Sequence, residues 1–233
     1  MAKLPLPKEE YLFRGHAACP GCGAPLALRY TMKALGERVI MNVPAGCTPV
    51  IGGIWPRSAF NFNLIDHAFE STGAVASGVR AALDAMGMDD VTVLAWAGDG
   101  GTVDIGLQAL SGAVDRGTDF IYVMMDNEAY MNTGIQCSGS TPIGAWTTTT
   151  PVGKQCEINL QRKKKIMEMM VANGIVYGAT VNVAYPEDFV KRVKRANEFR
   201  GPKFIHALSP CAPGWRVDTS RTVEMARLAT QTN

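Results

Sequence analysis

The sequence predicts an α/β fold, with a mostly parallel sheet and helices on both faces. Short apolar runs typical of buried strands alternate with longer segments typical of helices. Glycine and proline clusters separate these segments, and polar residues gather directly after the apolar runs. Continuous alternation of this kind is typical of parallel sheets. The 233 residues are therefore interpreted as one domain, with residues 1–50 forming a loop-rich N-terminal arm.

The first half of the chain is predicted to contain seven segments. In order, they are a helix over 24–35, a strand over 37–43, a short apolar segment over 60–68, a helix over 71–86, a strand over 91–97, a helix over 102–116 and a strand over 120–125. The helix over 71–86 is rich in alanine and glycine, which permits close packing. Gly87 suits its C-terminal cap.

The second half begins with a long segment, residues 127–160, that is rich in threonine, glycine and serine and lacks periodicity. Because long loops inside a compact domain usually carry function, an active-site or interface role is expected for it. The basic run 162–165 is interpreted as a solvated face that opens a helix, with a docking role as the alternative. The remaining predicted elements are a strand over 175–180, a helix over 187–199, a strand over 203–208 and a helix over 219–230.

Polar clusters follow two consecutive strands. Gly98-Asp99-Gly100 comes directly after one, and Asp126-Asn127 directly after the next. Both clusters should therefore lie at the carboxyl edge of the sheet, where open α/β sheets bind ligands. Mg²⁺ prefers hard oxygen ligands, which the Asp99 carboxylate, the Asn127 amide and the Ala129 carbonyl can supply. Because the glycines also let a phosphate approach the backbone, a magnesium-held diphosphate site is predicted.

A Gly-Asp-Gly tripeptide by itself is more often an ordinary turn than a binding motif. The second cluster, at the next strand end, favours the diphosphate interpretation. The segment 98–103 does not fit the Gly-x-Gly-x-x-Gly spacing of a dinucleotide site, and the sequence has no Gly-Lys-Ser/Thr of a Walker loop.

Four of the six cysteines lie in three separate tight loops: Cys19, Cys22, Cys47 and Cys211. Four thiolates from such loops could hold Zn²⁺ or an iron–sulfur cluster. A redox pair at Cys19 and Cys22, or simple buried thiols, are the alternatives. Disulfides are not expected, because nothing marks the chain as secreted. Cys137 and Cys156, in the long loop, are interpreted as buried or half-buried thiols.

Together these motifs resemble the thiamine diphosphate subunit of the 2-oxoacid:ferredoxin oxidoreductases, in particular the beta subunit of pyruvate:ferredoxin oxidoreductases (pyruvate synthases). The resemblance covers nearly the whole chain and implies a thiamine diphosphate-binding fold. Its landmarks are GHAACPGCG (15–23), AGC (45–47), AFE (68–70), AGDGG (97–101), DNEAYMNTG (126–134), AYPED (184–188) and SPCAPGW (209–215). One departure is visible: the family's chains usually run on past the helix corresponding to 222–230, whereas this sequence ends at Asn233.

The resemblance also implies site residues. It assigns a [4Fe–4S] cluster near the thiamine to Cys19, Cys22, Cys47 and Cys211, and Mg²⁺ to Asp99, Asn127 and the Ala129 carbonyl. It places Asn132 beside the reacting carbon, where its amide could donate to an oxyanion or to the substrate carboxylate. The alternative for Asn132 is an Asx-turn role. The other cofactor-binding residues are Gly46, Cys47, Gly98, Gly100, Gly101, Tyr130 and Thr133.

The implied activity is oxidative decarboxylation of a 2-oxoacid, pyruvate first, to acetyl-CoA and CO₂, with electrons passed through the cluster to ferredoxin. In the family, another polypeptide or domain supplies the glutamate that activates the thiamine. Alpha-, gamma- and delta-type partner subunits are therefore expected. The substrate alternatives are oxalate, 2-oxoisovalerate or another 2-oxoacid. The functional alternatives are a non-oxidative thiamine enzyme subunit with structural zinc and a non-enzymatic iron–sulfur electron carrier.

Composition limits the expected partners and location. The net charge of +2 gives no argument for nucleic acid or an anionic membrane. No stretch approaches the roughly 18 apolar residues of a membrane span. The first ten residues lack the apolar run of a signal peptide. Six cysteines without such a signal fit a reducing compartment, so a cytoplasmic protein is expected.

Overall fold

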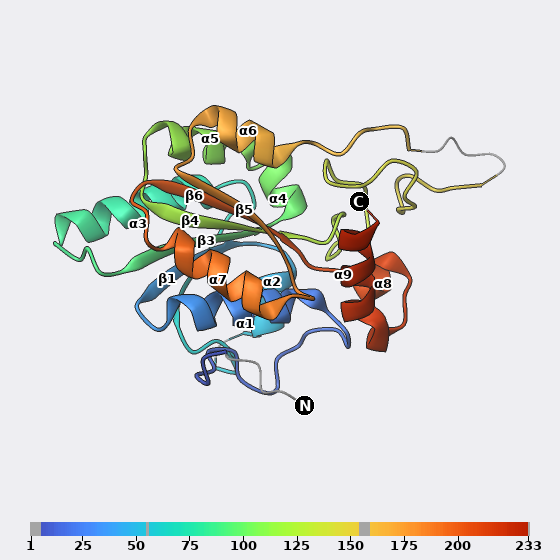
Figure 1. The fold of residues 1–233 in the computed structure, drawn as a ribbon, viewed down its shortest axis with the longest axis horizontal. Helices are drawn as coiled ribbons and strands as arrows, with labels where there is room; N and C mark the ends of the chain where they lie inside the picture. The colour runs from blue at the N-terminus through green and yellow to red at the C-terminus, as the bar shows by residue number, and fades with distance from the viewer. Residues whose placement is uncertain (1–5, 55, 154–158, 233) are drawn as a thin grey trace.

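A six-stranded sheet organises the structure, a computed structural model that describes residues 6–54, 56–153 and 159–232 (Figure 1). The strand order is β2–β1–β3–β4–β6–β5, and every pairing is parallel, which confirms the predicted sheet. The strands are β1 (Val39–Pro44), β2 (Asn63–His67), β3 (Thr92–Gly98), β4 (Phe120–Asp126), β5 (Tyr177–Asn182) and β6 (Pro202–Leu208).

Helices cover both faces of the sheet, as predicted, and Figure 1 shows α1 and α7 on one side with α5 and α6 on the other. One face carries α1 (Gly23–Leu35), α2 (Cys47–Gly52), α7 (Pro186–Ala196) and α9 (Thr222–Gln231). The other carries α3 (Thr72–Ala85), α5 (Leu107–Asp115) and α6 (Ile166–Asn173). The short elements are α4 (Asp99–Val103), α8 (Ala212–Trp215) and the 3₁₀ turn η1 (Thr219–Arg221).

Strand β3 shows why a sheet covered on both faces needs continuous apolar runs. Leu94 and Trp96 belong to the core under α1 and α7, whereas Val93 and Ala95 belong to the core under α3 and α5. Successive side chains of a strand point to opposite faces, so all five central positions, 93–97, are buried.

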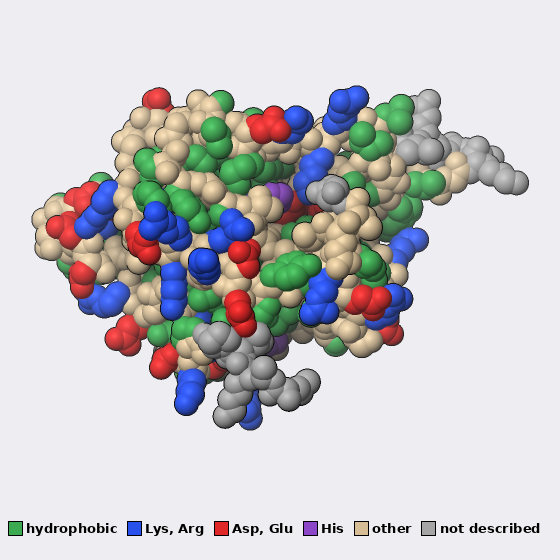
Figure 2. Space-filling model, viewed as in Figure 1, with side chains coloured by type: hydrophobic (Ala, Val, Ile, Leu, Met, Phe, Trp, Pro, Cys, Tyr) green, Lys and Arg blue, Asp and Glu red, His purple; other side chains and the backbone are tan. Residues whose placement is uncertain are grey.

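The helix α7 has a buried apolar stripe and a charged outer face. Arg192 pairs with Asp188, and Arg195 pairs with Glu198. Figure 2 shows basic and acidic side chains interspersed on the surface viewed there.

None of the helices in the described part of the chain has the length and apolarity that crossing a membrane requires.

The single helix predicted over 102–116 is wrong. The chain turns helical already at Asp99, α4 ends at Val103, and α5 begins at Leu107. A Cβ atom on Gly106 would lie only 2.0 Å from the Gly101 carbonyl oxygen. The chain therefore turns tightly between the two helices, at a contact that only glycine permits.

The arm predicted over residues 1–50 is shorter in the structure. Strand β1 lies inside the sheet, and α1 belongs to the core. Of the described residues in this stretch, 6–22 precede the sheet as a loop tied down by hydrogen bonds. Phe13 N–H donates to Ala59 O at 2.8 Å, for example. Cys47, predicted in a tight loop, begins α2 instead.

The long loop is confirmed, since 127–153 and 159–165 contain no helix and no strand of the sheet. The helix predicted to open at residue 162 begins only at Ile166.

Candidate functional site

A cavity of about 290 Å³ opens where β1, β3 and β4 end. Gly98 pairs with Met125 in the sheet, so the next residues, Asp99 and Asp126, lie beside each other at the carboxyl edge. The lining includes every predicted diphosphate and catalytic residue: Gly46, Cys47, Gly98, Asp99, Gly100, Gly101, Asn127, Ala129, Tyr130, Asn132 and Thr133. Segments that are distant in sequence thus meet at one edge of the sheet, as the strand-end argument predicts.

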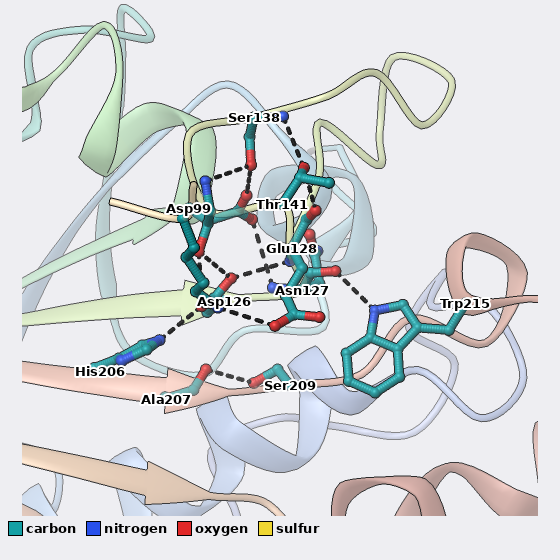
Figure 3. A network of polar contacts seen from close by, with 12 residues as sticks. Asp99, Asp126, Asn127, Glu128, Ser138, Thr141, His206, Ala207, Ser209 and Trp215 are labelled. Atoms are coloured by element: carbon teal, nitrogen blue, oxygen red, sulfur yellow. Dashed lines mark hydrogen bonds and ion pairs between the residues drawn. The ribbon is translucent and has the colours of Figure 1, made fainter. Parts of the chain in front are cut away.

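Asp99 and Asn127 lie side by side at the end of β4 (Figure 3). One terminal atom of the Asn127 amide lies 2.8 Å from Ala129 O and 3.0 Å from Asp99 Oδ1. If the amide nitrogen occupies this position, the Asn127 side chain donates to both oxygens. With the amide oxygen there, three oxygen atoms face one another, which is an arrangement that a bound cation balances. The donor set therefore fits Mg²⁺.

The environment of Asp99 makes its charge costly. The side chain is fully buried, and Ser138 Oγ donates to its carboxylate at 2.5 Å. Burial, followed by the nearby charge of Asp126, raises the pKa of Asp99 well above its ordinary value. A divalent cation would reverse that shift, because it stabilises the ionised carboxylate. Asp99 is thus better suited to binding a cation than to carrying an unpaired charge.

Asp126 is fully buried as well, but donors surround it (Figure 3). His206 Nε2 donates to its carboxylate at 2.6 Å, Lys163 Nζ at 2.8 Å and Ser140 Oγ at 2.9 Å. Burial alone would raise the pKa of Asp126, but the His206 hydrogen bond and the Lys163 charge lower it. The solvated face predicted for the basic run is therefore wrong for Lys163, because this side chain binds a buried carboxylate.

The long loop supplies contacts that the sequence analysis missed. Besides the bonds from Ser138 and Ser140, Thr141 Oγ1 donates to the Glu128 carbonyl at 2.7 Å (Figure 3). The loop therefore folds back over both strand ends. The run Cys-Ser-Gly-Ser-Thr over 137–141 carried a usable signal, since small hydroxyl side chains can satisfy buried carboxylates.

Tyr130 covers the glycines after β3. A Cβ atom on Gly100 would lie 2.2 Å from Tyr130 Cε1, and the Tyr130 hydroxyl donates to Asp104 at 2.8 Å. Asn132 and Thr133 are exposed at the cavity mouth. The hydrogen bonds among the described residues include none that the Asn132 side-chain oxygen accepts, so the Asx turn does not form within that part of the chain.

The loops that carry the four predicted cluster thiols pack together. Gly23 N–H, next to Cys22, donates to Pro210 O at 3.0 Å, next to Cys211. Burial raises the pKa of Cys47 to about 12 and that of Cys22 to about 11, and neighbouring thiols add to both shifts. Cys47 also lines the cavity, so the thiol cluster adjoins the cavity. These four thiols are the donor set that a [4Fe–4S] cluster requires.

The described residues contain no group of three His, Cys, Asp or Glu side chains arranged to hold a single metal ion. Cys137 is half-buried, as predicted, and Cys156 lies outside the described residues.

Comparison with known proteins identifies the family of this chain. Residues 45–207 match the family described as "Thiamine pyrophosphate enzyme, C-terminal TPP binding domain", thiamine pyrophosphate being the same compound as thiamine diphosphate. That range contains β3 and β4 and every lining residue of the cavity apart from Val43 and Pro44, the last two residues of β1.

Two relatives are similar over nearly the whole chain. Ketoisovalerate oxidoreductase subunit VorB of Pyrococcus abyssi is 55% identical over 99% of this chain and 76% of its own. Pyruvate synthase subunit PorB of Methanothermobacter thermautotrophicus is 51% identical over 97% of this chain and 79% of its own. A solved structure of 2-oxoglutarate:ferredoxin oxidoreductase from Magnetococcus marinus has the same fold, with a TM-score of 0.75 at 22% identity over 95% of this chain and 80% of that chain. The chain therefore belongs to the thiamine pyrophosphate enzymes and, among them, to the 2-oxoacid:ferredoxin oxidoreductase subunits of the PorB and VorB type.

Proposed function

We propose that this chain is the subunit of a 2-oxoacid:ferredoxin oxidoreductase that binds thiamine diphosphate through Mg²⁺ and holds a [4Fe–4S] cluster beside it. The observation that carries the proposal is one cavity in which Asp99, Asn127 and the Ala129 carbonyl converge while Cys47 forms part of the wall. Thiamine diphosphate supplies the nucleophilic carbon and the electron sink for loss of CO₂ from a 2-oxoacid, and the cluster supplies a one-electron acceptor.

Each group of residues has a defined task in this proposal. Asp99, Asn127 and the Ala129 carbonyl hold Mg²⁺ on the diphosphate. Gly98, Gly100 and Gly101 leave room for the phosphates close to the backbone. Asn132, at the exposed mouth, donates its amide to the substrate's carbonyl oxygen or carboxylate.

Cys19, Cys22, Cys47 and Cys211 hold the cluster. Because Cys47 belongs to both the thiol group and the cavity wall, electrons have a short path out of the cavity. They leave one at a time to ferredoxin, and coenzyme A takes the acyl group. Partner subunits complete the thiamine site, so the chain by itself should be inactive. Decarboxylation by the isolated chain would contradict that expectation.

Pyruvate is the first candidate substrate. 2-Oxoisovalerate is the second, because three relatives that are 53–55% identical, all from Pyrococcus species, are ketoisovalerate oxidoreductase subunits. The PorB relatives from methanogens are 44–51% identical. A comparison of kcat/KM for the two acids in one preparation decides between them.

The test of the whole proposal is anaerobic purification with the partner subunits, followed by analysis of iron, sulfide, zinc and thiamine. We expect about four iron and four sulfide per chain from this subunit. We also expect a visible absorbance that is bleached by a 2-oxoacid with coenzyme A. Zinc without iron would remove the electron-transfer part, and absence of thiamine would overturn the proposal. Bleaching by 2-oxoisovalerate but not by pyruvate would change only the substrate.

A further inference from the structure

Lys163 reaches from the far end of the long loop into the turn that follows β4. Its Nζ lies 2.8 Å from Asp126 Oδ2 and 2.9 Å from Glu128 Oε1. These two acids flank Asn127 in the chain, so one ammonium group bridges both neighbours of a proposed magnesium ligand. The Lys163 side chain is only 30% exposed, and the Asp126 side chain is fully buried. Because water has little access to the Lys163–Asp126 pair, removing either side chain would leave the other charge buried and uncompensated.

The bridged turn has a strained backbone. Glu128 has a φ of +71°, a left-handed conformation that residues other than glycine rarely adopt. Its N–H donates to Asp126 Oδ1 at 3.0 Å, and its carboxylate accepts from Lys163. Strained conformations of this kind persist only where the surroundings over-determine them. The turn they stabilise is the one that directs the Asn127 amide and the Ala129 carbonyl toward Asp99.

The other lysines of the basic run have different partners. Lys164 Nζ pairs with Asp104 at 2.6 Å, beyond the end of α4. Lys165 is 75% exposed and pairs with Glu168 on the surface. His206 bonds Asp126 without reaching Glu128. Among these cations, Lys163 is thus the one that joins both acids of the turn.

We infer that Lys163 is a positioning residue. It holds the turn 126–129 in the shape that presents the magnesium ligands, and so it sets the affinity for magnesium thiamine diphosphate. This inference rests on the proposed function, since it concerns the same site. It adds that the end of the long loop controls the metal-binding turn, although Lys163 itself does not line the cavity.

The test compares Lys163→Met, Lys163→Arg and the matched control Lys165→Met in the assembled enzyme, stripped of cofactor. Lys163→Met should weaken magnesium thiamine diphosphate binding in calorimetry by roughly 10- to 100-fold, the range for residues that support metal ligands. Lys163→Arg can still bridge the two acids and should recover most of the affinity, and Lys165→Met should match wild type. At saturating cofactor, kcat should fall far less than affinity.

A second readout needs no cofactor. The Glu128 amide donates to Asp126, so Lys163→Met should speed hydrogen exchange in the peptide covering 126–131, and Lys165→Met should not. If Lys163→Met does not assemble, Glu128→Gln serves instead, because it removes one ion pair and leaves the other. An intermediate loss of affinity is then expected.

Two results separate the inference from the proposed function. Wild-type enzyme that binds magnesium thiamine diphosphate while Lys163→Met binds it within about twofold of wild type would overturn the inference. Wild-type enzyme that binds no thiamine diphosphate would overturn the proposed function.

Discussion

Trp215 Nε1 donates a hydrogen bond to the carbonyl oxygen of Asn127 at 2.9 Å (Figure 3). This bond joins α8, which begins directly after Cys211, to the turn that carries the proposed magnesium ligand. Gly214 reinforces the contact, because a Cβ atom there would lie 2.2 Å from Met131 Sδ. The loop that carries Cys211 and the turn 126–129 therefore stabilise each other on this side of the cavity.

Replacing Trp215 by phenylalanine should loosen that connection. The variant keeps an aromatic ring but leaves the Asn127 carbonyl without its donor, and an unmet buried acceptor costs about 1–3 kcal/mol. We expect a lower melting temperature and several-fold weaker binding of magnesium thiamine diphosphate in the assembled enzyme. Trp146→Phe is the control, because the Trp146 ring stacks under Arg216 and phenylalanine retains a ring for that contact. Equal behaviour of the two variants would show that the Trp215 bond contributes nothing.

The sequence predicted the centre of the site because its signals are local. Asp99 and Asn127 each come after an apolar run that is typical of a buried strand, and parallel strands bring such positions to one edge. The support beneath them was not predictable in this way. Lys163 reaches Asp126 from a loop without periodicity, so no pattern in the sequence places it there.

The prediction of a single helix over 102–116 was wrong for a related reason. Gly106 is needed because a Cβ atom at this position would lie 2.0 Å from the Gly101 carbonyl oxygen. That contact exists only in the folded chain. A glycine inside a helical pattern therefore signals a break only once its neighbours in space are known.

Asp99→Asn should separate the two proposed cofactor sites. The variant keeps the shape of the side chain and removes the charge that Mg²⁺ requires. Binding of magnesium thiamine diphosphate should weaken by roughly 100-fold or more, which corresponds to about 2.7 kcal/mol. The visible absorbance of the cluster should remain, because Asp99 is not one of its ligands.

The folding control for Asp99→Asn is the stability of the cofactor-free enzyme. Burial and Asp126 already disfavour a charge on Asp99, so the neutral variant should be at least as stable as wild type. Loss of the cluster absorbance together with thiamine binding would show that the two sites cannot be separated.

The pair Asp119 and Lys203 gives a prediction about acid stability, far from the cavity. Lys203 is only 4% exposed and donates to Asp119. Burial alone would raise the pKa of Asp119, but bonds from Lys203 and Arg200 lower it below its ordinary value. A carboxylate whose pKa is lower in the folded state stabilises the protein above its unfolded pKa of about 3.9. That stabilisation is lost as the pH falls through the folded value.

Asp119→Asn should therefore destabilise the protein at pH 7, and its difference from wild type should shrink below about pH 4. Burial also lowers the pKa of Lys203 despite the neighbouring carboxylate, so the lysine is costly to keep charged without Asp119. Combining Asp119→Asn with Lys203→Met should then recover part of the loss, because no buried charge remains unpaired. Thermal unfolding at pH 3 to 8 measures both effects, and a gap that stays constant down to pH 3 would refute the linkage.

Gly73 and Gly78 on α3 should respond in opposite directions to the same substitution. A Cβ atom on Gly73 would lie 2.5 Å from the Ala109 carbonyl oxygen on α5, whereas Gly78 has nothing within 4 Å. Gly73→Ala must push α5 away from α3, at a cost of about 1–3 kcal/mol. Gly78→Ala should stabilise the helix by roughly 0.5–1 kcal/mol, because alanine loses less backbone freedom on folding. Melting temperatures measured side by side should fall for the first and rise for the second. A rise for both would mean that α3 and α5 do not pack as closely at Gly73 as the structure shows.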